Sequence, residues 1–181
     1  MNKIITPAFP GSYVHLDKPF ALGEGPEKYS IQIVLPKEDP FWDRIKKAGD
    51  EIAKEKWGKK PAGLRLTIND GDATDREEVQ GCYYMTASCD GDRPPEIVDA
   101  QRQPIIEPNK LYSGAIYIVS LRGYAWDNKY GKGVSFGLSN VMRVADGTPI
   151  DGRTSAASDF DDLDLDDFMD EDPVGPDDDL L

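Results

Sequence analysis

The 181-residue chain has room for one folded core and an appendage but hardly for two domains, and its apolar fraction of 39% is low for an entirely globular chain. Residues 1–153 hold all 21 Lys and Arg against 22 Asp and Glu, whereas residues 154–181 hold 12 acids and no base, so the net charge of −13 lies almost wholly in the C-terminal segment. We therefore predict a folded domain over residues 1–153 and a disordered acidic tail over residues 154–181.

Membrane, secreted and metal-binding classes are disfavoured. No apolar run approaches the roughly 20 residues of a membrane span, and residues 1–7 lack the long apolar stretch of a secretion signal. Cys82 and Cys89 are too far apart along one predicted strand to form a disulfide. One His and two Cys are too few soft ligands for a usual structural zinc site. We expect a cytoplasmic protein with reduced thiols and with no metal or other cofactor.

In chain order, the first clear element is a strand that ends at Pro36. Its residues alternate between two faces: Tyr29, Ile31, Ile33 and Leu35 face inward, and Lys28, Ser30 and Gln32 face outward. Asp39 and Pro40 form a helix start, and the apolar residues that follow at helical spacing predict one helix ending near Trp57 and Gly58.

Strand signals continue beyond the helix. Residues 69–78 are polar and predict a loop, and residues 82–89 predict a strand. Residues 90–110 contain four prolines and predict a long irregular connection, with a short edge strand at Ile97 and Val98.

The clearest element is a long hairpin, with arms over residues 115–126 and 132–144 joined by residues 127–131. Alternation assigns its side chains to two faces: Tyr117, Val119, Leu121, Val134, Phe136, Leu138 and Met142 face the core, and Ser120, Arg122, Tyr124, Trp126, Ser135, Ser139 and Arg143 face away. A cation and two aromatic rings on an outer face indicate a surface on which a ligand stacks.

Short strands, one principal helix and glycine-punctuated bends predict a mainly β fold, a closed or nearly closed barrel of the oligonucleotide-binding (OB) type. The OB helix lies between the third and fourth strands, whereas here it precedes the predicted strand 82–89. An early hairpin over residues 8–14 or a permuted strand order would account for this difference.

Signatures of catalysis are absent from the sequence: it has no Walker phosphate loop, no G-x-S-x-G elbow and no H-E-x-x-H motif. A cluster of acids would suit a magnesium-dependent nuclease, but a solvated turn is the better explanation. The cluster consists of Asp70, Asp72, Asp75, Glu77 and Glu78. We predict that the protein is not an enzyme.

The candidate nucleic-acid contacts lie on the hairpin. Arg122, Tyr124 and Trp126 share one strand face, and the pattern continues through the hairpin tip with Lys129, Tyr130 and Lys132. Cations attract phosphates, and aromatic faces stack unpaired bases at about 1–3 kcal/mol each. Packing of Tyr124 and Trp126 under residues 90–110 explains the same pattern, and alternation does not decide between the two interpretations.

The segment 154–181 mixes acids with regularly spaced apolar residues and ends in Asp177-Asp178-Asp179-Leu180-Leu181. So much like charge with so little apolar mass predicts disorder. A coil of this length spans about 30 Å, enough to reach around a domain of about 15 Å radius. The regular spacing suggests contacts with partners, and a solubilising tail is the simpler alternative.

An ordered series of short motifs runs along the chain: Lys28-Tyr29-Ser30 leading to Leu35-Pro36-Lys37, Asp70-Gly71-Asp72, Gly81-Cys82-Tyr83, Tyr112-Ser113-Gly114, Gly137-Leu138-Ser139-Asn140-Val141, and Asp146-Gly147-x-x-x-x-Gly152-Arg153. Together they resemble the phage and prophage family of single-stranded-DNA-binding proteins typified by the Enc34 phage protein. The resemblance implies an OB fold, sequence-tolerant binding of single-stranded DNA (ssDNA), no catalysis and an acidic tail. Tails of bacterial and T7-like phage counterparts end in an aromatic residue, a role that Phe168 takes here as a hypothesis.

We therefore expect a protein that coats and protects ssDNA during phage DNA replication, recombination or repair, in the cytoplasm of an infected or lysogenic bacterium. The expected DNA contacts are the six hairpin residues together with Lys28 and Tyr83. Phe168 and residues 177–181 are expected to recruit phage or host replication and recombination proteins, and a homodimer is compatible with the sequence. The alternative is an acidic protein that mimics DNA and occupies a nucleic-acid enzyme. The near-zero net charge of residues 1–153 favours that alternative.

Overall fold

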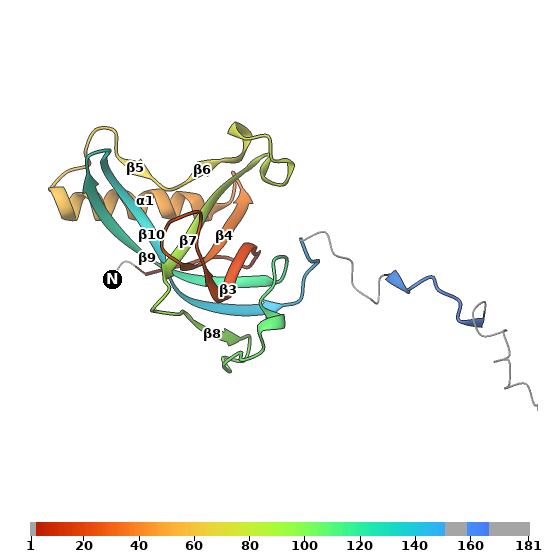
Figure 1. The fold of residues 1–181 in the computed structure, drawn as a ribbon. Coiled ribbons are helices and arrows are strands. Elements are labelled where there is room, and N and C mark those ends of the chain that lie inside the picture. The colour runs from red at the N-terminus through yellow and green to blue at the C-terminus, as the bar shows by residue number, and fades with distance from the viewer. Residues whose placement is uncertain (1–2, 151–158, 167–181) are drawn as a thin grey trace, which may run out of the picture. The chain divides into compact units, whose positions relative to one another are not determined.

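The computed structural model describes residues 3–150 and 159–166, and the chain divides into two compact units, Met1–Asp151 and Gly152–Leu181. The first unit is built largely of strands (Figure 1). Its elements are β1 (Lys3–Ile5), β2 (Phe9–Pro10), β3 (Ser12–Phe20), β4 (Lys28–Pro36), α1 (Pro40–Trp57), β5 (Arg65–Leu66), β6 (Asn69–Asp70), β7 (Cys82–Asp90), β8 (Glu96–Asp99), β9 (Ile116–Asn128) and β10 (Gly131–Ala145), with 3₁₀ turns at Gly71–Ala73, Glu77–Val79 and Pro108–Lys110. This composition confirms the prediction of a mainly β fold with one principal helix.

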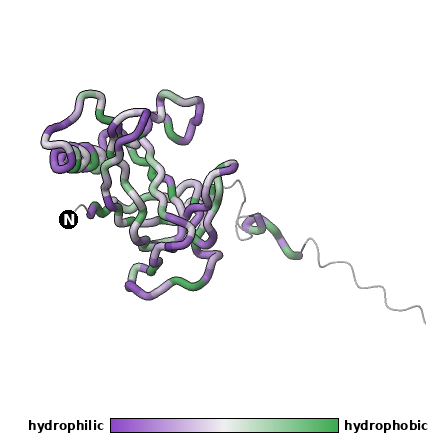
Figure 2. The backbone as a smooth tube through the Cα atoms, turned by 60° about the vertical axis from the view of Figure 1, so that its left-hand side comes forward, coloured by the Kyte–Doolittle hydropathy of each residue, from purple (hydrophilic) through white to green (hydrophobic). Residues whose placement is uncertain are grey.

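The strands form two sheets that share one core. The first has the order β1-β9-β10-β5, with β2 paired to β9 and β8 paired to β10, and the second has the order β3-β4-β7-β6. Buried side chains from both sheets meet between them, among them Ile31 and Met85 of the second sheet and Tyr117 and Leu121 of the first. Figure 2 shows the central strands in white and green more often than the peripheral loops, which are largely purple. The two sheets therefore wrap a single apolar interior.

Helix α1 covers one side of this interior and follows its sequence signals closely. Asp39 Oδ1 accepts a hydrogen bond from the Phe41 N–H at 2.9 Å, and Pro40 occupies the first turn. The helix ends at Gly58, whose φ of 75° is the left-handed conformation that glycine adopts without steric cost. Its apolar stripe packs against β9 and β10, so the predicted helix and both of its ends are confirmed.

The hairpin of β9 and β10 confirms the predicted faces over most of its length. A β-bulge interrupts the pattern, because Leu138 pairs with Leu121 and Asn140 pairs with Ser120, which leaves Ser139 as an extra residue. Beyond the bulge Val141 is buried in the core. The core assignment of Met142 and the outward assignment of Arg143 were both wrong, since one inserted residue reverses the alternation that follows it and Arg143 pairs with the buried Tyr117.

Cys82 and Cys89 are free thiols, as expected, and partial burial raises the pKa of both above the ordinary thiol value. In the part of the chain that the structure describes, no helix is long and apolar enough to cross a membrane. Residues 159–166 belong to the second unit and expose Phe160, Leu163 and Leu165. The expected docking residues Phe168 and 177–181, and most of the predicted disorder over 154–181, lie outside the described residues.

Candidate nucleic-acid interface

The outward faces of β3, β4, β7, β9 and β10 enclose three adjoining hollows, here called the groove. The first and second hollows share Tyr13, His15 and Arg76, and the second and third share Lys28 and Ser88. Other residues that line the groove include Phe20, Gln32, Glu78, Asp90, Arg93, Arg122, Tyr124 and Gly137. Because the hollows share residues, they form a continuous path across both sheets.

Strand alternation sets the floor of the groove. In the β4–β7 ladder, Ser30 pairs with Ser88 and Gln32 pairs with Thr86 on the groove side. The intervening residues of both strands face the core. Gln32 therefore faces outward as predicted, but it is only 7% exposed, because Arg76 lies over it and donates from Nη2 to Gln32 Oε1 at 3.0 Å.

The groove carries an excess of positive charge in a unit that is close to neutral. Its cations are Lys28, Arg76, Arg93 and Arg122, whereas its acids are Glu78 and Asp90. Residues 1–153 as a whole have a net charge of −1. The groove thus has a local excess of positive charge, which would attract a polyanion.

Aromatic rings line the same path. Tyr13 is 57% exposed, Phe20 50% and Tyr124 54%. His15 and Phe20 stack on each other with ring centroids 4.4 Å apart and planes 8° from parallel. Exposed flat rings beside cations are the combination that binds unpaired bases and their phosphates.

Arg76 lies where the first two hollows meet. Its guanidinium carbon is 5.1 Å from the centroid of the Tyr13 ring and 5.3 Å from that of Tyr84. Partial burial is the largest single influence and disfavours the charged guanidinium, but the hydrogen bond to Glu78 and the electrostatic effects of Tyr13, Glu78 and Tyr84 together outweigh it and raise the pKa of Arg76. Tyr13 has a φ of 46°, a left-handed conformation that is uncommon for a residue other than glycine and that often marks a functional position.

Three of the residues expected from the sequence, Lys28, Arg122 and Tyr124, line the groove together. Trp126 is half-buried farther along β9, where its Nε1 donates to Ser135 Oγ at 2.9 Å. The Trp126 ring lies over Gly133 of the neighbouring strand, 2.1 Å from where a Cβ would stand. Trp126 thus packs within its own hairpin, whereas Tyr124 remains 54% exposed.

The hairpin tip and Tyr83 lie apart from the groove. Lys129 lies over Tyr130 with 5.0 Å between Nζ and the ring centroid, and Lys132 lies over Trp57 at 5.3 Å. None of these tip residues lines the three hollows.

Tyr83 pairs with Leu35 on the core side of β7 and packs edge-on against Trp42, with ring centroids 5.8 Å apart. Its neighbour Tyr84 faces the groove side, where it contacts Arg76. Met85 and Ala87 are both fully buried, and Tyr83 is two residues before Met85 on the same face of the strand. Alternation from these two apolar residues was therefore the signal in the sequence that places Tyr83 on the core side and Tyr84 on the groove side.

The sequence interpretation missed the contributions of β3, of the loop after β6 and of the turn after β7. The groove residues that it did not identify are Tyr13, Phe20, Arg76 and Arg93. Register shifts in the β3–β4 ladder disturb the alternation of β3. Arg76 lies among acids in a polar loop. Neither the disturbed alternation of β3 nor this acidic loop therefore indicated a binding face.

Three acids of the cluster, Asp70, Asp72 and Glu78, are engaged in ion pairs. Lys37 Nζ lies 2.7 Å from Asp70 Oδ1 and 2.6 Å from Asp72 Oδ2. The hydrogen bonds from Lys37 hold the pKa of both carboxyls below the ordinary value of 3.8. Within residues 3–150 and 159–166 no group of three or more His, Cys, Asp or Glu side chains is arranged to hold a metal ion. A solvated turn anchored by a lysine accounts for this segment.

Comparison with solved structures identifies proteins of similar fold. Among solved structures, the ssDNA-binding protein from bacteriophage Enc34 in complex with ssDNA is 28% identical, with a TM-score of 0.70, over 82% of this chain and 89% of that chain. A second structure of that protein has 28% identity and a TM-score of 0.69, over 89% and 90% of the two chains. The ssDNA-binding protein gp2.5 of bacteriophage T7, at 16% identity and a TM-score of 0.57 over 90% and 94%, shows a likeness of fold alone.

These likenesses confirm the expected OB-like fold. A search of the curated proteins found no match. The family described as "Enterobacter phage Enc34, ssDNA-binding protein" matches residues 2–171 of the sequence. With nearly its whole length matched, the chain belongs to the Enc34 family of ssDNA-binding proteins.

Proposed function

We propose that this protein binds ssDNA along the groove, without catalysis, and coats and protects single strands exposed during phage DNA replication, recombination or repair. The observation that carries the proposal is the joint presence of four cations and three exposed aromatic rings on one continuous path. Membership of the Enc34 family supports the same conclusion, since a related structure holds ssDNA.

In the proposed mechanism the groove cations bind the phosphates of the DNA backbone, and the aromatic rings stack against the bases. If Lys28, Arg76, Arg93 and Arg122 each neutralise one phosphate, binding releases about 0.7 counterion per contact. The slope of log K against log salt concentration is then about −3. Stacking on Tyr13, Phe20 and Tyr124 accepts any base, because every base has a π face, so binding should tolerate sequence changes.

The hairpin tip can extend the path in the same proposal. Tyr130 is exposed, and Lys129 and Lys132 flank it. Trp126 lies between Tyr124 and the tip along β9. A longer oligonucleotide would reach these residues after filling the groove, whereas Tyr83 has no place on this path.

The acidic tail is proposed to regulate DNA binding and to recruit replication or recombination proteins. Residues 154–181 carry 12 acids and no base, so they can compete with DNA for the groove cations at a high effective concentration. Regularly spaced apolar residues supply contacts for a partner, with Phe168 and residues 177–181 as the proposed docking segment.

Titration of fluorescently labelled oligothymidine with the full-length protein tests the proposal. We expect a rise in anisotropy that weakens with added salt at a slope of about −3. A DNA-mimicking protein would leave the anisotropy unchanged and would instead inhibit a nucleic-acid enzyme. The near-neutral folded unit favours the mimic, but the local excess of cations in the groove argues against it.

A further inference from the structure

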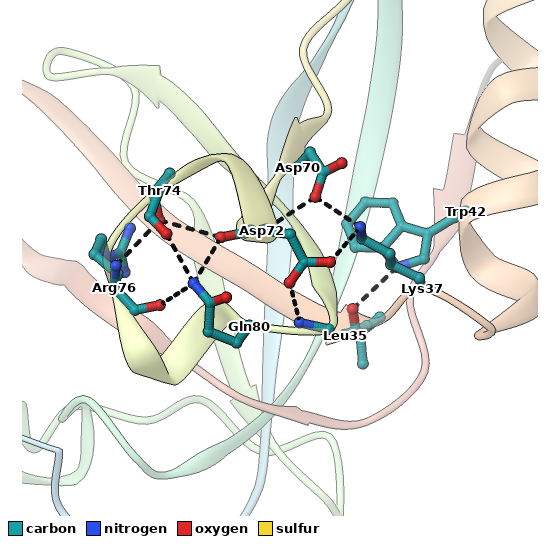
Figure 3. A network of polar contacts seen from close by, with 10 residues as sticks. Leu35, Lys37, Trp42, Asp70, Asp72, Thr74, Arg76 and Gln80 are labelled. Atoms are coloured by element: carbon teal, nitrogen blue, oxygen red, sulfur yellow. Dashed lines mark hydrogen bonds and ion pairs between the residues drawn. The ribbon is translucent and has the colours of Figure 1, made fainter.

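The loop between β6 and β7, residues 71–81, contains a polar network centred on one glutamine (Figure 3). Gln80 Nε2 lies 3.1 Å from the carbonyl oxygen of Gly71, 2.8 Å from that of Thr74 and 3.1 Å from that of Arg76. Thr74 Oγ1 in turn accepts from the Arg76 N–H at 3.3 Å. A single side chain therefore ties together the backbone on both sides of the segment that leads into Arg76.

The base of this loop is held by Lys37, which pairs with both Asp70 and Asp72. Asp72 Oδ1 also accepts from the Gly81 N–H at 2.8 Å, which links the two ends of the loop. Figure 3 shows Lys37, Asp70 and Asp72 together, next to the Gln80 network. These contacts fix the loop relative to the end of β4.

The loop is also closely packed. Val79 is fully buried. A Cβ at Gly71 would stand only 1.8 Å from the Val79 carbonyl oxygen, so the backbone leaves no room for a side chain there. Close packing and hydrogen bonds thus both hold the loop in place.

This conformation places the Arg76 guanidinium in the groove. Its Nη2 donates to Gln32 and its Nε donates to Glu78 at 2.8 Å, while the rings of Tyr13 and Tyr84 lie beside it. Those two bonds use two of the five N–H donors of arginine. The planar fork suits a phosphate, and a guanidinium held in place by the protein loses less side-chain freedom on binding.

We propose that Arg76 contacts the phosphate backbone of bound ssDNA where the first two hollows meet, and that Gln80 is the positioning residue that holds Arg76 there. The inference rests on the proposed function. It adds to the proposed DNA contacts one residue, Arg76, that lies in a loop rather than in a β-strand. Arg76 binds the ligand directly, whereas Gln80 acts only through the backbone of the loop.

Full-length variants tested by oligothymidine anisotropy across a salt series separate these roles. Arg76→Ala should weaken binding about fivefold at 0.1 M salt and make the slope shallower by about 0.7, because one phosphate contact is lost. Gln80→Ala should weaken binding by up to the same factor and change the slope in the same direction. In the Arg76→Ala background, Gln80→Ala should have no further effect.

Two further variants control for folding. Gln80→Met keeps the length of the side chain but has no donor, so it should bind as weakly as Gln80→Ala even if it melts like the wild type. Gln101 is an exposed glutamine outside the groove, and Gln101→Ala should bind as the wild type does.

The outcomes distinguish the inference from the proposed function. No binding by the wild type would refute the proposed function. Wild-type binding with an unchanged affinity and slope for Arg76→Ala would overturn only the role of Arg76. An equal loss on Gln80→Ala in both backgrounds would overturn the positioning role, since a general loss of stability would act whether or not Arg76 is present.

Discussion

Replacing Tyr124 with alanine tests whether an aromatic ring in the groove stacks a base. Tyr124 is 54% exposed, and its ring comes near Gly137 at Cε1, which would stand 3.7 Å from a Cβ added there. One open face can stack one base, which is worth about 1–3 kcal/mol. The dissociation constant for oligothymidine should therefore rise about 5- to 150-fold. The salt slope should stay the same, because the lost contact carries no charge.

The assay is fluorescence anisotropy of labelled oligothymidine at several salt concentrations, with thermal unfolding as the check on folding. Tyr124→Phe is the matched control, since it keeps the ring and should bind within about twofold of the wild type. Binding of Tyr124→Ala within twofold of the wild type would refute the stacking argument. An equal loss in Tyr124→Phe would assign the effect to the hydroxyl group rather than to the ring.

Further predictions follow from charge, packing and protonation. Arg122→Gln should make the salt slope shallower by about 0.7, measured by the same titration, and an unchanged slope would remove Arg122 from the phosphate contacts. Deleting residues 154–181 should tighten binding and steepen its salt dependence, because a tethered polyanion no longer competes; weaker binding on deletion would contradict the competition. Gly71→Ala should destabilise the fold by about 2 kcal/mol or more in chemical denaturation, because the added methyl meets backbone that cannot move away, and an unchanged midpoint would show that the loop rearranges. The two carboxyls paired with Lys37 have lowered pKa values in the folded state, so their contribution to stability is present above pH 3.8 and is lost as pH falls through the folded values. Denaturation of Lys37→Met should show a smaller loss between pH 5 and pH 2 than the wild type, and equal losses would contradict the pairing.

Regular alternation explains why the hairpin was predictable, and the Asp39–Pro40 start with apolar residues at helical spacing explains why the helix was. Tyr117 and Leu121 are fully buried, and Arg122 and Tyr124 reach the opposite face, as a period of two requires. No comparable pattern in the sequence indicates the bulge at Ser139. This bulge reversed the faces on which the following side chains of β10 lie, so the faces predicted for them were wrong.

The other half of the groove depends on tertiary contacts that no local pattern encodes. Tyr13 lies in the irregular strand β3 and itself has a left-handed backbone conformation, which brings its ring to the groove. Arg76 reaches it because a loop folds over β4 and is held by Lys37 and Gln80, residues 39 and 4 positions away in the sequence. An acidic loop with one arginine looks like a solvated turn until its partners are known.

UV cross-linking of oligothymidine to the full-length protein, with the cross-linked residues identified by mass spectrometry, tests the central claim most directly. The account predicts cross-links at Tyr13, Phe20 and Tyr124, because these exposed rings line the groove. Cross-links confined to Tyr83, or no cross-link to the residues of the groove, would contradict it.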